Sequence, residues 1–175
     1  LVGQSVAIAM NLVEPIHHIE TIPNLDAITA IAVIVLSLLA GLVSRLFVYS
    51  LHKTHHVFAM IENAYVRAIV GAVIIIVLTL LVGNQDYNGA GAHMIERALE
   101  GDVPLYAFLL KILFTSVTLS SGYKGGEIIP SLIIGATLGS AFGTVFGLPA
   151  GLWAEVGMVA VFCGVTNCPI TSLLI

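Results

Sequence analysis

Four stretches that carry no ionisable side chain constrain the fold of this chain more than any other feature. They cover residues 27–44, 68–84, 128–154 and 156–175. Each is long enough, or nearly so, to cross the hydrocarbon core of a bilayer, which takes about 20 helical residues. The whole chain is 58% hydrophobic and only 9% charged, whereas an ordinary soluble domain is about 25% charged. We therefore expect an all-α polytopic membrane protein.

Polar, glycine and proline residues between the apolar stretches predict where the helices begin and end. The expected helices cover residues 27–57, 68–83, 92–99, 103–121 and 130–147, with a turn at 62–67 and a loop at 84–91. Residues 1–11 read as the end of another apolar helix, followed by an exposed loop that contains Glu14, His17, His18 and Glu20. Two late breaks are expected, one at Leu148, Pro149 and Gly151 and one at Asn167, Cys168 and Pro169. Interrupted helices at membrane depth are typical of transporters, because protein or a polar cavity must satisfy the unwound backbone.

The composition argues against several classes of function. A net charge of −4 with no run of basic residues excludes a nucleic-acid partner. Cys163 and Cys168 lie five residues apart in an apolar stretch, which is neither a redox nor a zinc spacing, so we expect small buried side chains there. Asp86, His93 and Glu96 supply acid and base groups, but no Ser or Cys nucleophile motif accompanies them. We expect neither an enzyme nor a bound cofactor.

A cluster of histidines follows the first complete apolar stretch. His52, His55 and His56 share one face of the expected helix, which is a spacing that can bind a metal ion. Arg45 and Lys53 lie beside them, and basic side chains at the end of a membrane span reach for water. We expect a polar interfacial face, with a membrane-embedded metal-binding protein as the weaker alternative.

The segment 122–130, GYKGGEIIP, predicts a glycine-turned loop that opens a long uncharged helix, and we expect the N-terminus of this helix to be buried in the membrane protein. Pro130 is expected at the first helical position, where its missing amide proton costs nothing. The amides of Gly125, Gly126, Glu127, Ile128 and Ile129 are then free donors. In a low-dielectric setting these amides and the positive end of the helix dipole can replace the water around an anion without a tightly binding full charge. The segment lacks the GK[ST] ending of a nucleotide-binding loop and follows no predicted strand.

The helix after Pro130 carries glycine at every fourth position. Gly135, Gly139, Gly143 and Gly147 form a smooth stripe, which is typical of closely packed membrane helices. We expect this stripe to hold the anion-facing helix start in place.

Residues 120–143, SSGYKGGEIIPSLIIGATLGSAFG, resemble the second-half signature of the CLC chloride channels and anion/proton antiporters, whose pattern there is GxFxP. The loop at 84–91 and the step at 167–171 also lie at the order and distances of that family. The resemblance implies that residues 1–175 are a later part of a CLC-type transmembrane domain, and we expect the chain to be truncated at both ends. It further implies a multi-pass homodimer of tilted and broken helices in the cell membrane that transports chloride or fluoride as its substrate.

By the same resemblance, the backbone amides of Glu127 and Ile128 contact the central anion, and Gly126 and Pro130 frame them. Two positions depart from the pattern, since Ile128 replaces the phenylalanine and Glu127 replaces an apolar residue. The altered motif is similar to that of the fluoride/proton branch. Lys124 would raise the local anion concentration at an aqueous mouth.

Glu127 is the one ionisable residue at the expected site, and its role has two interpretations. It could titrate and thereby couple proton movement to anion movement, or gate the pathway. Alternatively it could face water, pair with Lys124 or cap the free amides of the helix start. The alternative from another class of protein is a non-conducting membrane scaffold in which the glycine stripe only packs helices. The choice between channel and antiporter stays open.

Overall fold

The computed structural model describes residues 26–172. The helix expected at residues 1–11 and the loop with Glu14, His17, His18 and Glu20 lie outside these residues. Within the described range the regular structure is entirely helical, as expected. Its elements are α2 Ala27–Ala59, α3 Ala64–Val82, α4 His93–Glu100, α5 Ala107–Ser120, α6 Ile128–Phe146, α7 Ala150–Thr166 and α8 Pro169–Ser172.

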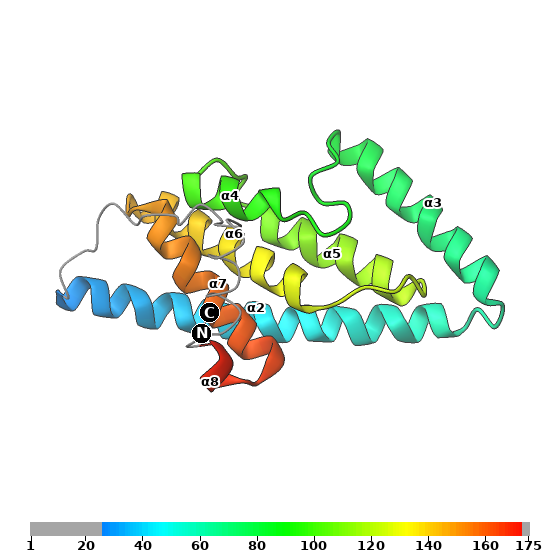
Figure 1. Cartoon of the computed structure of the whole chain (residues 1–175), viewed down its shortest axis with the longest axis horizontal. Helices are drawn as coiled ribbons and strands as arrows, with labels where there is room; N and C mark the ends of the chain where they lie inside the picture. Colours follow the sequence, from blue (N-terminus) through cyan, green and yellow to red (C-terminus); the bar gives the residue numbers. More distant parts are fainter. Residues whose placement is uncertain (1–25, 173–175) are drawn as a thin grey trace, which may run out of the picture.

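Helix α6 is the centre of the bundle. It packs against α7, α5, α4 and α2, and 67% of its most apolar stretch is buried. In contrast, only 6% of the most apolar stretch of α3 is buried, and Figure 1 shows α3 leaning away from the rest of the helices. By length and composition α2, α3 and α6 can each cross a membrane, and α5 and α7 are shorter apolar helices. The middle of α6 is therefore enclosed by protein, whereas its first two residues, Ile128 and Ile129, are exposed.

One hydrophobic core joins α2, α5, α6 and α7. Its buried members are Leu36, Ala40, Val43, Phe47, Ile112, Ile134, Leu138, Phe142, Trp153 and Val161. A second cluster packs the loop after α3 and helix α4 onto α5 and α6, through Tyr87, Met94, Ala107, Phe114 and Ile133. The second cluster places the loop at 84–91 next to the start of α6.

Three of the four stripe glycines form the contact between α6 and α7, as expected. A Cβ at Gly135 would lie 2.6 Å from the Cα of Met158, and one at Gly139 would lie 2.6 Å from the carbonyl carbon of Trp153. Gly143 faces Ala150 with a corresponding distance of 3.1 Å. The prediction for Gly147 was wrong, because nothing lies within 4 Å of its Cβ position. With φ at 66° it ends α6 in the left-handed conformation that favours glycine.

Several predicted boundaries were also wrong, each for a local reason. Helix α3 begins at Ala64 rather than at residue 68, because the side chain of Asn63 caps it and accepts a hydrogen bond from the amide of Tyr65 at 2.9 Å. Helix α5 begins four residues later than expected, after a turn in which the amide of Ala107 donates to the carbonyl of Pro104 at 2.9 Å.

The first of the two late breaks, between α6 and α7, is shorter than expected, since α7 starts at Ala150 and includes Gly151. The second late break follows the prediction, because Asn167 ends α7 with φ at 54°. Helix α6 begins at Ile128, so Pro130 is its third residue rather than its first. Proline is tolerated there because amides of the first turn have no acceptor within the helix.

Candidate functional site

The candidate site is the loop that joins α5 to α6, residues 121–127. Gly122 turns the chain with φ at 95°, and the guanidinium of Arg67 lies above it, 3.5 Å from the position that a Cβ would take. The hydroxyl of Tyr123 donates to the carbonyl of Ala68 at 3.1 Å. The N-terminal part of α3 therefore holds one side of this loop in place.

The amides at the start of α6 are free donors in the described residues. No backbone or side-chain acceptor within residues 26–172 receives a hydrogen bond from the amides of Gly125, Gly126, Glu127, Ile128 or Ile129. These amides carry the positive end of the α6 dipole, and α6 is 19 residues long. The free amides that the sequence predicts are present, with the helix starting two residues earlier, and residues 122–129 are exposed in the described chain.

A cavity lies on each side of this loop. The larger has a volume of about 520 Å³ and is lined by the loop, by α5, by the start of α6 and by Tyr87, Gly89 and Ala90 of the preceding loop. The smaller, of about 440 Å³, lies between the loop and the end of α2, where His52 and His55 line it. Lys124 and Gly125 line both cavities. A small ion therefore has space on either side of the free amides.

The side chain of Glu127 lies at the smaller cavity, with His52 and His55. It makes no capping hydrogen bond to the start of α6, and it forms no ion pair with Lys124 among the described residues. Two of the structural roles considered for Glu127, cap and partner of Lys124, are therefore wrong. Glu127 is exposed and lines the smaller cavity, so the third structural role, a side chain that faces water, stays a prediction.

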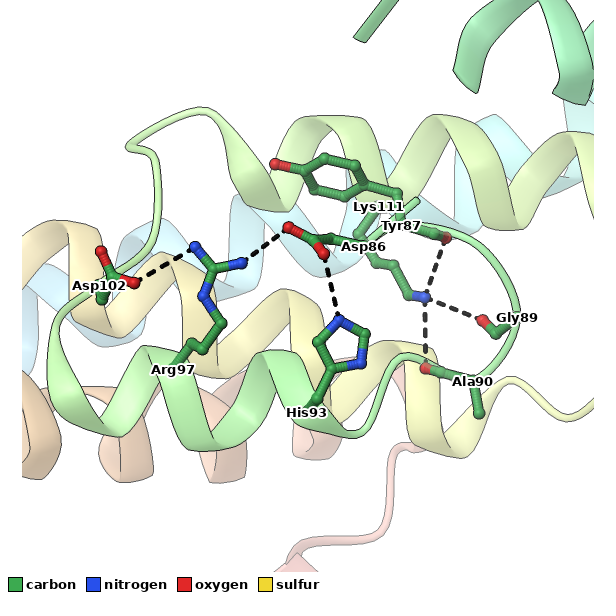
Figure 2. Close-up of polar contacts among 8 residues, drawn as sticks. All are labelled: Asp86, Tyr87, Gly89, Ala90, His93, Arg97, Asp102 and Lys111. Atoms are coloured by element: carbon green, nitrogen blue, oxygen red, sulfur yellow. Dashed lines mark hydrogen bonds and ion pairs between the residues drawn. The ribbon is translucent and has the colours of Figure 1, made fainter. Parts of the chain in front are cut away.

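The wall of the larger cavity contains residues that the sequence analysis missed. Phe114, Thr115 and Thr118 of α5 face it, and Tyr87, which is 3% exposed, closes it from the loop at 84–91. Behind this wall lies Lys111 of α5, which is fully buried. Figure 2 shows its ammonium surrounded by the carbonyl oxygens of Tyr87, Gly89 and Ala90. The sequence feature that could have drawn attention to Lys111 is that it is a single cation in an otherwise uncharged helix.

Ion pairs fix the same loop to α4. The guanidinium of Arg97 lies 2.7 Å from one carboxylate oxygen of Asp86 and 3.4 Å from Asp102, and His93 approaches Asp86 at 3.5 Å (Figure 2). The hydrogen bond to Asp86 raises the pKa of the Arg97 guanidinium, and burial raises the pKa of the Tyr87 phenol. Asp86 and His93 therefore belong to this network, and Glu96 forms no ion pair within residues 26–172.

The remaining candidates do not gather into a site. His52, His55 and His56 are exposed, and residues 26–172 contain no group of three His, Cys, Asp or Glu that could hold a metal ion. Cys163 is half-buried and Cys168 is exposed, so the expectation of two buried thiols was wrong. The left-handed turn at Asn167 ends α7 and places Cys168 beyond the packed helix.

Long apolar helices around a buried helix whose start offers free amides define an integral membrane protein. The chain belongs to the voltage-gated chloride channel family, whose family model, "Voltage gated chloride channel", matches residues 1–175. This confirms the family that the segment 120–143 resembles.

Individual relatives agree with this assignment. The chain is 30% identical over 181 residues to a protein named "Chloride/fluoride channel protein" from Pseudomonas syringae pv. tomato (strain ATCC BAA-871 / DC3000), covering 99% of this chain and 40% of that protein. It is similar to the "Crystal structure of a CLC-type fluoride/proton antiporter", with a TM-score of 0.84, 27% identity and coverage of 93% of this chain and 42% of that one. The CLC-type helical fold is confirmed, and the chain spans about two fifths of the length of these relatives.

Proposed function

We propose that the complete protein carries chloride or fluoride across the cell membrane, as a CLC-type channel or anion/proton antiporter and not as an enzyme. The observation that carries this proposal is the set of unpaired amides from Gly125 to Ile129 between two cavities. The names of the relatives support the choice of ion, because both refer to fluoride and one also refers to chloride.

The chemistry of the site suits a migrating ion. An anion that loses its water needs donors, and amides at a helix start offer partial positive charge in a fixed geometry. Because the charge is partial, binding is weak enough for the ion to leave. Lys124 lines both cavities and forms no ion pair among the described residues, so its charge is available to attract anions to the loop.

Glu127 is the proposed proton-coupling or gating group. Its carboxylate borders the smaller cavity without a partner in the described chain, and its own amide is one of the free donors. A proton that binds this carboxylate removes a negative charge beside the anion, so protonation and anion occupancy favour each other.

The proposal also includes a homodimer in which each subunit holds its own pathway. Cross-linking of the complete protein in lipid tests this assembly.

The experiment that tests the function compares two glycine-to-valine variants of the complete protein in liposomes. A Cβ at Gly126 meets nothing within 4 Å, so Gly126→Val fills the space before the amides and leaves the packing intact. We expect the flux of both chloride and fluoride to fall about tenfold or more, which corresponds to about 1.4 kcal/mol. Gly41→Val is the matched control, because Gly41 of α2 also has open space around its Cβ position.

Equal flux in the two variants would contradict the placement of the anion at these amides. A complete wild-type protein that moves neither ion would support the non-conducting scaffold.

A further inference from the structure

The inference concerns Lys111, and it rests on the proposed anion pathway. Lys111 is 0% exposed, and its three N–H groups have three acceptors, which are the carbonyls of Tyr87 at 3.2 Å, Gly89 at 3.0 Å and Ala90 at 3.3 Å. These contacts satisfy the donors of an ammonium group completely. All three acceptors are neutral, and no carboxylate of residues 26–172 forms an ion pair with it. A full positive charge is therefore held inside the protein.

The partners of Lys111 are also the wall of the larger cavity. Tyr87, Gly89 and Ala90 all line it, together with Lys124 and the residues at the start of α6. Lys111 itself lies behind this wall and is not a lining residue. It therefore acts on the cavity through the loop that it holds.

Helical spacing places Lys111 on the side of α5 that faces the cavity. Phe114, Thr115 and Thr118 follow it by three, four and seven residues, and all three line the cavity. On the other side, the ammonium lies 2.9 Å from the Cβ position of Gly91, which also lies 3.7 Å from Cδ1 of Ile133 in α6. Lys111 thus occupies the junction of α5, the loop and α6.

We propose that Lys111 is a positioning residue for the anion site. It holds the Tyr87 to Ala90 wall against the start of α6, and its buried charge raises the affinity of the adjacent cavity for an anion. A charge buried without a counterion is costly, and a bound anion nearby would offset part of this cost. Water screens such an interaction weakly inside a protein.

The test measures the binding of sodium fluoride and sodium chloride to the purified complete protein by titration calorimetry. Lys111→Met leaves an unbranched side chain that is one atom shorter and removes the charge and all three donors. We expect it to weaken anion binding about tenfold or more. Lys111→Arg retains the charge and the donors, and we expect it to restore most of the affinity.

Two further variants separate positioning from general stability. Val161→Ala removes volume from the core at α7, and Val161 lines neither cavity beside the loop, so it should lower the melting temperature and leave the affinity within about twofold of wild type. Gly91→Ala introduces a Cβ 2.9 Å from the ammonium nitrogen of Lys111. The φ of residue 91 is 69°, a left-handed conformation that favours glycine. We expect it to displace Lys111 and weaken anion binding even though the charge is retained, and it decides the question alone if Lys111→Met does not fold.

Wild-type affinity in both folded Lys111→Met and Gly91→Ala would overturn the inference, and so would a lower melting temperature with unchanged affinity. The outcome is distinguishable from failure of the proposed function. If Gly126→Val abolishes anion binding and Lys111→Met does not, the amide site stands and only the role of Lys111 is lost. If neither variant changes anion binding, both the amide site and the role of Lys111 are contradicted.

Discussion

The guanidinium of Arg97 lies 2.7 Å from a carboxylate oxygen of Asp86, and this contact joins α4 to the loop that forms one wall of the larger cavity. The two side chains are 35% and 30% exposed, so water weakens the pair. Lys111 holds the same loop from the opposite side, through backbone carbonyls. The contacts of this loop therefore include a partly exposed ion pair with α4 and a buried ammonium from α5.

The Asp86–Arg97 contact should contribute modestly to stability. For the pair Asp86→Asn and Arg97→Met we expect a coupling free energy of about 0.5–1 kcal/mol, the range typical of partly exposed ion pairs. A double-mutant cycle on the unfolding of the complete protein measures it. A coupling close to zero would mean that Lys111 and the Tyr87 packing hold the loop without help from α4.

Replacing a glycine between α6 and α7 should destabilise the bundle. Gly135→Ala places a Cβ 2.6 Å from the Cα of Met158, and backbone at this distance must shift. We expect a loss of about 1–3 kcal/mol, the usual cost of overpacking. Thermal unfolding in detergent measures this loss. Gly41→Ala is the control, because it adds a Cβ to a helix in open space and should leave stability unchanged or raise it by up to about 1 kcal/mol.

Pro130→Leu should disturb the start of α6. Pro130 is buried and is the third residue of the helix, so the larger side chain and the new amide both change the first turn. We expect anion flux in liposomes to fall about tenfold, because the amides of Ile128 and Ile129 lose their fixed direction. Pro130→Ala adds the amide without the bulk, and its flux should lie between those of wild type and Pro130→Leu. Wild-type flux in both variants would argue against a site at this turn.

Glu127→Gln should change how protons accompany the anion. The variant keeps the shape and the free amide and removes the titratable group. If the protein is an antiporter, we expect the number of protons moved per anion to fall, as measured by parallel recording of proton and anion movement in liposomes. An unaltered ratio would assign Glu127 a role other than proton coupling.

Local patterns in the sequence predicted much of this fold. The long α2, the break at Asn167 and the packing of Gly135, Gly139 and Gly143 follow from hydropathy, from turn residues and from small-residue spacing. The predicted start of a helix was wrong where a single capping side chain or a turn at a proline determines it, as at Asn63 and Pro104.

The cavity wall could not be predicted from local patterns. Lys111 and Gly89 are 22 residues apart, and they meet only because α5 passes beneath the loop when α4 packs on α6. In the sequence Lys111 was only an interruption in an apolar segment. Its spacing from Phe114, Thr115 and Thr118 was visible, but the partner on the other side was a set of backbone carbonyls, which carry no sequence signature.

The backbone contact between α6 and α7 limits how the molecule can change shape. Helices separated by side chains can slide as rotamers adjust, whereas Gly135, Gly139 and Gly157 leave no such layer between the two backbones. We therefore expect α6 and α7 to move together as one rigid body. If an anion binds at the start of α6 as proposed, we expect the movements that admit or release it to occur in the glycine-rich turn before Ile128 or in segments that pack around it.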